Sequence, residues 1–370
     1  MELYVRNGQK NLRCGYTTGT CAALAASGAA RLLLTGQAPP TLRLRTPKGR
    51  TVETAPRFCV LENGAARCGV EKDAGDDPDV TNGCLVVAEV RKTDGGIAID
   101  GGAGVGRVTK PGLEQPIGAA AINRVPRRMI AEAAERERAA ANYQGGLSVT
   151  VSVPDGERLA RKTMNPALGI VGGISILGTS GIVEPMSEKA ITDAIAVEIR
   201  QAAASGTRLV LTPGNYGLEF LRQSGIASGV PVVRCSNYVG DALDAAAEGF
   251  QSVLLVGHIG KLVKLAGGIM NTHSKQADCR NELFCAHAAI CGADAPLCRA
   301  LMDAATTDEC ISLLDAAGLR RAVMESLLAA IQRRLERRVD YAVGAALFSN
   351  QYGFLGQTDA AERILAAWRA

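Results

Sequence analysis

Three apolar segments in the second half of the chain limit its possible folds most, because each is followed by a turn and then by a helical stretch. The segments are LVLTPGN (209–215), VVRCSN (232–237) and VLLVGHIGK (253–261). Short apolar runs that alternate with helices are typical of parallel strands joined by right-handed crossovers. We therefore predict an α/β domain with a small parallel, doubly wound sheet, followed from Asp278 onward by a helical C-terminal region.

The first half of the chain has a different pattern, in which short β-type runs within 42–90 alternate with turn residues. A helix capped by Thr18 or Thr20 is predicted to run to about Leu34, and a second helix is predicted near 125–138. Strands and helices in this irregular order indicate an α+β domain.

A chain of 370 residues is long enough for two or three domains. We place one boundary near Pro185, where a glycine-rich loop ends and a helical stretch begins. The expected organisation is an α+β domain over 1–186, followed by the α/β domain and its helical region over 187–370.

Composition and charge argue against several classes of protein. Lys and Arg number 41 against 37 Asp and Glu, so the formal net charge is +4, and no long basic run is present. Aromatic residues make up 4% of the chain, which disfavours a base-stacking platform. No apolar run is long enough to cross a bilayer, and the first ten residues lack the apolar core of a signal peptide. We expect a cytoplasmic protein without nucleic-acid or membrane partners.

The eleven cysteines include no CxxC pair. Such a pattern fits reduced thiols better than a disulfide framework. Four of the cysteines lie within 279–298, but their spacing of six, six and seven residues puts them on shifting faces of a helix. We predict no zinc or iron–sulfur site there.

Two other segments have the composition of ligand loops without the full pattern. GDDPDVTNG (75–83) contains three aspartates but lacks the ligand spacing and distal Glu of a calcium loop, which favours a turn with local side-chain bonds. GGAGVGRVTK (101–110) resembles a phosphate loop, but Pro111 follows it, which favours an extended, turn-bounded segment. We expect no metal site in the protein.

The turns after the three apolar segments are the candidate cofactor site. Parallel sheets bind ligands at the carboxyl ends of their strands, where loops present backbone amides. The alternative is that each turn only connects a strand to a helix. The candidate cofactor-binding residues are Gly214, Asn215, Gly217, Ser236, Asn237, Gly257 and Gly260.

His258 is the candidate catalytic residue, because it ends the third apolar segment and is expected at the same edge. A neutral imidazole there can accept a proton, and Lys261 beside it would favour the neutral form. The alternative is a ring whose hydrogen bonds are satisfied by the loop backbone.

Six strings, taken together and in order, resemble the CbiD family over more than two thirds of the chain. They are GYTTGTCAA (15–23), GDDPDVTNG (75–83), GVGRVTKPGL (104–113), AINRVPRRMI (121–130), NPALGIVGGISILGTSGIVEPMSE (165–188) and LLVGHIGKLVKLAGGIMNTHS (254–274). The resemblance implies transfer of a methyl group from S-adenosylmethionine to C-1 of cobalt-precorrin-5B in anaerobic cobalamin biosynthesis. It also implies that cobalt enters only as part of the corrinoid substrate.

A corrinoid of this kind carries acetate and propionate groups, which require cationic donors. The candidate substrate-binding residues are Arg107, Lys110, Arg127, Arg128, Lys261 and Lys264. The turn with Thr17, Thr18 and Thr20 is a further candidate, since its hydroxyls and free helix amides can bind a carboxylate of the substrate, or the cofactor. Simple helix capping is the alternative for this turn.

Two other functions stay open from the sequence. One is a corrinoid-binding protein without chemistry, and the other is a different nucleotide-dependent α/β enzyme. The expected partners are the small-molecule corrinoid and, through direct contact, neighbouring enzymes of the pathway.

Overall fold

The computed structural model describes residues 3–7, 10–166 and 168–369. The chain divides into two compact units, Met1–Ser187 and Glu188–Ala370. Each unit has its own hydrophobic core. No helix in the described ranges is both long and apolar enough to cross a bilayer.

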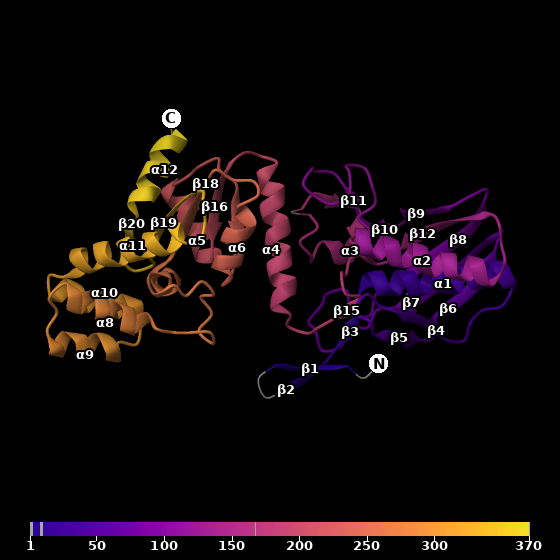
Figure 1. Cartoon of the computed structure of the whole chain (residues 1–370), viewed down its shortest axis with the longest axis horizontal. Coiled ribbons are helices and arrows are strands. Elements are labelled where there is room, and N and C mark those ends of the chain that lie inside the picture. Colours follow the sequence, from indigo (N-terminus) through magenta and orange to yellow (C-terminus); the bar gives the residue numbers. More distant parts are fainter. Residues whose placement is uncertain (1–2, 8–9, 167, 370) are drawn as a thin grey trace. The chain divides into compact units, whose positions relative to one another are not determined.

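The N-terminal unit is built on a five-stranded sheet with two long helices packed together beside it (Figure 1). The strand order is β6 (Phe58–Glu62), β7 (Ala65–Glu71), β8 (Leu85–Thr93), β12 (Gly146–Ser152) and β9 (Ile97–Gly101). All pairs are antiparallel except β12 with β9. The helices are α1 (Thr18–Thr35) and α2 (Arg124–Ala140).

Helix α1 is buried along most of its length because its side chains are mainly Ala, Gly, Ser and Thr. At Gly28 a Cβ atom would lie 2.6 Å from the Cys68 sulfur, so only glycine allows this approach to the sheet. The helix cap differs from the prediction: Thr17, not Thr18 or Thr20, accepts the Thr20 amide at 3.2 Å. The helix ends at Gly36, whose φ of 73° suits glycine.

The remaining elements of the N-terminal unit are short strands and one short helix. They are β1 (Tyr4–Asn7), β2 (Lys10–Arg13), β3 (Gly15–Tyr16), β4 (Leu42–Arg45), β5 (Thr51–Thr54), β10 (Gly104–Val105), β11 (Arg107–Val108), α3 (Gly156–Ala160), β13 (Ile170–Val171), β14 (Gly173–Ile174) and β15 (Ile182–Val183). The glycine-rich run 101–110 is therefore extended and opens no helix, as predicted.

One cysteine pair departs from the expectation of reduced thiols. Cys59 and Cys68 are directly opposite each other in the antiparallel pair β6 and β7, with 4.2 Å between their Cα atoms, and they form a disulfide. Strand register brings the two thiols together, and spacing along the chain does not show this. The other nine cysteines are free.

The C-terminal unit contains the predicted parallel sheet. Its order is β17 (Val232–Arg234), β16 (Arg208–Thr212), β18 (Ser252–His258), β19 (Ala342–Ser349) and β20 (Gly353–Gln357), with β20 antiparallel to β19. Successive residues of β16 face opposite sides, so that Leu209 and Leu211 pack in one core and Val210 in another. Both faces of the sheet are therefore covered, as doubly wound folds require.

Strands β19 and β20 lie in the region that we expected to be helical, so that expectation is incomplete. The sequence AVGAALFS of β19 lacks the β-branched and aromatic enrichment typical of strands. At Gly344 a Cβ would overlap the backbone of Ala361, so close packing selects the small residue. The helices of this unit are α4 (Glu188–Ala203), α5 (Asn215–Ser224), α6 (Val239–Ala246), α7 (Ile259–Leu262), the 3-10 helix Val263–Gly267, α8 (Arg280–Ile290), α9 (Ala295–Asp303), α10 (Thr307–Ala316), α11 (Arg320–Glu336) and α12 (Asp359–Arg369).

Candidate functional site

The carboxyl ends of β16 and β18 are neighbours in the C-terminal sheet. The first strand of the unit, β16, lies between β17 and β18, so the direction of winding reverses between β16 and β18. Ligands of open α/β sheets bind at such a reversal. The structure thus brings the predicted turns Gly214–Gly217 and Gly257–Gly260 to one edge, and the turn at Ser236 and Asn237 follows β17 on the other side of β16.

Two glycines shape the turn between β16 and α5. A Cβ at Gly217 would overlap the hydroxyl of Thr212, so the first turn of α5 packs on the strand end without a side chain between them. A Cβ at Gly214 would meet open space. The fully buried Thr212 hydroxyl has no hydrogen-bond partner among the described residues. The carboxyl end of β16 therefore has backbone without side chains at two glycines, free space beside Gly214 and a polar atom without a hydrogen-bond partner.

The other predicted cofactor residues are partly engaged within the unit. Asn215 is exposed and accepts a hydrogen bond from Arg234 at 3.2 Å. Asn237 binds Thr272 through its carbonyl, at 2.8 Å, and its side-chain oxygen, at 3.4 Å. Ser236 has a φ of 53°, a conformation that non-glycine residues rarely adopt. Asn237 therefore fixes the segment after the 3-10 helix to this strand end.

His258 is half-buried at the end of β18 and caps α7. Its Nδ1 atom accepts a hydrogen bond from the Gly260 amide at 3.1 Å. The ring stands edge-on to Phe348, with 5.6 Å between centroids, and Tyr216 lies 6.5 Å away. Burial lowers the pKa of His258, and Asp308 partly opposes this shift. Burial, and not Lys261 as expected, is thus the main cause that favours the neutral ring.

The cap at Nδ1 decides which nitrogen of His258 carries the proton. In a neutral imidazole, a nitrogen that accepts a hydrogen bond is unprotonated, so the proton is on Nε2. Nε2 is then a donor, and the only lone pair available to a proton is already bound to Gly260. This geometry disfavours the general-base role that the sequence suggested and favours a hydrogen-bond donor.

Asp308 and Ser349 are polar residues of this edge that sequence reasoning missed. Ser349 ends β19 and is 2% exposed, and its hydroxyl donates to Oδ1 of Asp308 at 2.7 Å. Asp308 lies in the first turn of α10. Its other oxygen, Oδ2, has no hydrogen-bond partner in the part of the chain that the structure describes. One sequence signal could have identified Ser349. It follows an apolar run, as the three predicted turns do.

The two lysines after β18 differ in their surroundings. Lys261 is half-buried with Nζ 3.5 Å from the Pro213 carbonyl, and burial lowers its pKa. Lys264 is 2% exposed and donates to the carbonyls of Thr272 and Ala277 at 3.2 and 2.8 Å. These contacts disfavour the predicted substrate role of Lys264, because its ammonium holds the loop after the 3-10 helix. Lys261 lies at the carboxyl edge of the C-terminal sheet and remains a candidate ligand-binding residue.

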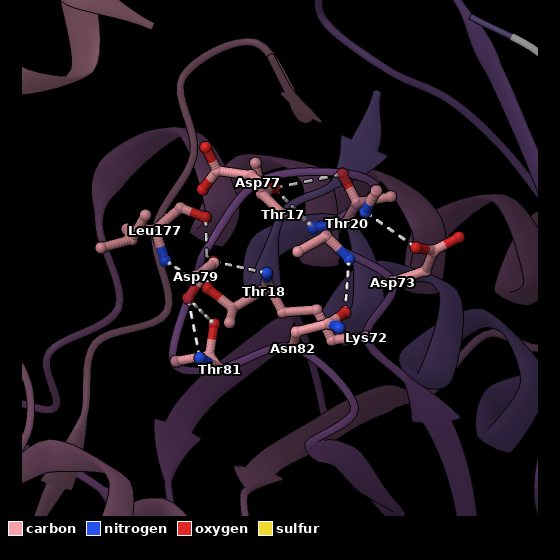
Figure 2. A network of polar contacts seen from close by, with 12 residues as sticks. Thr17, Thr18, Thr20, Lys72, Asp73, Asp77, Asp79, Thr81, Asn82 and Leu177 are labelled. Atoms are coloured by element: carbon pink, nitrogen blue, oxygen red, sulfur yellow. Dashed lines mark hydrogen bonds and ion pairs between the residues drawn. The ribbon is translucent and has the colours of Figure 1, made fainter. Parts of the chain in front are cut away.

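In the N-terminal unit, the three threonines at the start of α1 bind the segment that leads to β15 (Figure 2). Thr18 accepts the Leu177 amide at 3.0 Å, and Thr20 donates to the Gly181 carbonyl at 2.7 Å. All three threonines are buried. The hydroxyls of Thr18 and Thr20 therefore join α1 to residues 177–181, and the Thr17 hydroxyl caps the helix, which disfavours the predicted contact with a ligand and favours the capping alternative.

The acidic turn 75–83 lies beside these threonines and is held by local bonds, as predicted (Figure 2). Asp79 accepts from the amide and hydroxyl of Thr81 at 2.7 and 2.6 Å. It also forms an ion pair of 2.6 Å with Lys72, whose side chain is 2% exposed. Within residues 3–7, 10–166 and 168–369, no three His, Cys, Asp or Glu side chains are grouped as metal ligands.

Two of the predicted substrate-binding arginines already donate hydrogen bonds to groups of the N-terminal unit. Arg127 donates to the carbonyls of Ile122, Ile99 and Ala120 at 3.0, 2.9 and 3.3 Å, and burial lowers its pKa. Arg107 forms a bidentate pair with Asp100 at 2.8 and 2.9 Å. Their predicted roles are disfavoured, since a substrate carboxylate would have to displace these acceptors.

Lys110 and Arg128 are exposed. The aliphatic part of Lys110 packs near Gly169. Arg128 is 3.8 Å from Glu132, one turn further along α2. Both cations are therefore accessible to an anionic ligand.

Sequence comparisons relate the chain to one family. The family model CbiD matches residues 5–185, and the model described as CbiD, C-terminal domain, matches residues 271–359.

Similar proteins are found in several bacteria. The cobalt-precorrin-5B C(1)-methyltransferase of Ruminiclostridium cellulolyticum is 47% identical over 343 residues, which are 92% of this chain and 89% of the relative. The protein of the same name in Alkaliphilus metalliredigens is 41% identical over 370 residues, covering 99% of this chain and 97% of the relative. A crystal structure of the cobalamin biosynthesis protein CbiD from Archaeoglobus fulgidus matches with 33% identity and a TM-score of 0.42, covering 75% of this chain and 88% of that one.

Proposed function

Because this chain belongs to the CbiD family, we propose that it transfers a methyl group from S-adenosylmethionine to C-1 of cobalt-precorrin-5B in the anaerobic route to cobalamin. The observation that carries this function is the 47% identity to a methyltransferase of that name over 92% of the chain. The proposed alternatives, binding without chemistry and an unrelated nucleotide-dependent reaction, have no comparable support.

We place the methyl donor at the carboxyl edge of the C-terminal sheet. The free space over Gly214 and the unpaired hydroxyl of Thr212 fit a ligand that brings its own hydrogen-bonding groups. Lys261 is suited to the carboxylate of the methionine part, and Oδ2 of Asp308 to the ribose hydroxyls. His258 lies near Asp308, so a donor, a cation and an acceptor are present at one edge.

The proposed chemistry is direct displacement. S-adenosylmethionine supplies a methyl group already activated as a sulfonium, so the carbon–carbon bond at C-1 forms as the sulfur–carbon bond breaks and its electron pair stays on sulfur. The protein then needs to align two bound molecules, and no covalent enzyme intermediate is required. His258, which donates through Nε2, orients a bound oxygen atom and does not collect a proton.

Incubation of the full-length protein with S-adenosylmethionine and cobalt-precorrin-5B tests the function. We expect a corrinoid product heavier by one methyl group, with formation of S-adenosylhomocysteine. Calorimetry with S-adenosylhomocysteine, ATP and NAD separates the alternatives. A protein that binds only the corrinoid would be a carrier, and one that prefers ATP or NAD would belong to a different enzyme class.

Replacement of Asp308 with asparagine tests the placement of the cofactor. The variant keeps the side-chain size and an acceptor for Ser349 but loses the charge, so we expect affinity for S-adenosylhomocysteine to fall about tenfold. Asp303→Asn, at the exposed end of α9, is the matched control and should bind as the wild type does. Equal affinities of both variants and wild type in calorimetry would reject this edge as the ribose site.

A further inference from the structure

A hollow of about 340 Å³ lies between the end of β4 and the side of α2 in the N-terminal unit. Its floor includes Leu44 and Met129, which are 5% and 3% exposed. Its charged lining consists of Arg45, Arg128, Glu132 and Arg136. The hollow thus combines an apolar floor with an excess of positive charge.

The three charged residues that α2 contributes to the hollow share one face of the helix. Arg128, Glu132 and Arg136 are four residues apart, and this spacing aligns side chains along one stripe. Arg45, from β4, adds a third guanidinium to the same hollow. Two of the three arginines therefore come from a helix and one from a strand, so the cluster is a product of the fold.

The internal partners of these arginines are weak or missing. Arg128 is 3.8 Å from Glu132, and the two side chains are 61% and 70% exposed, so this ion pair adds little stability. The Arg45 guanidinium has no hydrogen-bond or ion-pair partner among the residues that the structure describes. Arg136 is held by Ser27 at 3.3 Å and by Glu137 at 3.7 Å. Two guanidinium groups are thus available to an anion while the third is held in place.

The hollow adjoins the loops around the start of α1. Thr46, which also lines the hollow, lies so close to Gly181 that a Cβ at Gly181 would be 2.8 Å from the Thr46 side chain. The Lys48 amide donates to the Ser180 carbonyl at 3.1 Å. Pro126, in the first turn of α2, packs near Gly19 of α1. The hollow is therefore joined to the segments that carry the family resemblance.

We propose that this hollow, of whose residues only Arg128 is a candidate above, binds carboxylate side chains of the corrinoid substrate; this inference rests on the proposed function. Guanidinium groups pair with carboxylates through two parallel hydrogen bonds, and the substrate carries acetate and propionate arms. Glu132 opposes such binding and limits its strength. The hollow takes the arms of the macrocycle, and the reacting carbon stays outside it.

Calorimetry of the full-length protein with two stable probes tests the proposal. The probes are cobyrinic acid, which keeps its peripheral carboxylates free, and its fully methyl-esterified form, which has none. We expect the wild type to bind the acid at least about tenfold more tightly than the ester. Arg45→Met and Arg128→Met should each weaken binding of the acid about fivefold, because each removes one charge-assisted pair.

Two further variants separate recognition from a change in folding. Glu132→Gln removes the only carboxylate of the lining and should tighten binding of the acid about threefold, a gain that no damaged fold produces. Arg43→Met is the matched control, because Arg43 lies on the same strand but pairs with Glu53 at 2.8 Å outside the hollow. It should bind the acid as the wild type does.

Two results would overturn the proposal. The first is wild-type affinity in Arg45→Met and Arg128→Met, and the second is a wild-type protein that does not distinguish the acid from the ester. Citrate identifies a different source of carboxylates: if citrate binds as tightly as cobyrinic acid and Arg128→Met loses both, the hollow is a site for free polyacids. Methyl transfer is measured separately, so it can persist when this inference fails.

Discussion

Replacement of Asp79 with asparagine is expected to lower the free energy of unfolding by about 3 kcal/mol, because it leaves the Lys72 ammonium buried without a counter-ion. The Lys72 side chain is 2% exposed and that of Asp79 is 25% exposed. Lys72 and the hydrogen bonds to Thr81 hold the pKa of Asp79 below its usual range, against the effect of burial. Urea denaturation followed by circular dichroism measures the change.

A double variant shows whether the loss comes from the unpaired charge. Lys72→Met together with Asp79→Asn removes both charges, and we expect it to recover more than half of the lost stability. Asp94→Asn, at an exposed position, is the control and should unfold as the wild type does. If Asp79→Asn is no less stable than Asp94→Asn, the ion pair is not what holds the acidic turn beside α1.

Replacement of His258 with alanine is expected to slow methyl transfer by a factor of about ten to a hundred, because the donor at Nε2 and the cap at Nδ1 are both lost. His258→Gln retains hydrogen-bonding capacity at this position, so its rate should stay within about fivefold of the wild-type rate. Single-turnover kinetics with both substrates bound measures these rates without the contribution of product release.

The glutamine variant distinguishes a donor from a general base. A base at His258 would make both variants slower by a factor of about a hundred to ten thousand, and the wild-type rate would fall as the pH drops through the lowered pKa of the ring. His287→Gln is the control, since this ring lies in α8 and contacts the Ser326 hydroxyl of α11 at 2.8 Å. Equal, large losses in His258→Ala and His258→Gln would restore the base.

Local patterns in the sequence predicted much of the secondary structure. The apolar runs that became β16, β17 and β18 are continuous and end in turns, so burial on both faces of a parallel sheet followed from them. The family resemblance was confirmed by the comparisons. In contrast, β19 was missed because close packing on α12 selects small residues, which carry no strand signal.

The predictions of individual site residues were less accurate than those of the strands. A sequence shows that a side chain is charged, but it does not show which group of the folded chain that charge contacts. Arg127 and Lys264 have the charge that a carboxylate ligand requires, but the fold surrounds each of them with backbone carbonyls. The threonines at the start of α1 were predicted as either caps or ligand contacts, and packing of 177–181 over them decided between the two. Only the folded chain shows which donors are already used.

The sequence by itself determined the three parallel strands β16, β17 and β18, the glycine turns at their ends and the family, since these depend on residues that are close along the chain. The tertiary structure decided the rest. It placed Asp308 and Ser349 beside His258, fixed the tautomer of that ring through the Gly260 amide, and brought Arg45 to the arginines of α2. The physical reason is that hydrogen bonds, ion pairs and burial act over a few ångströms between residues up to 161 positions apart, a range at which sequence periodicity carries no information.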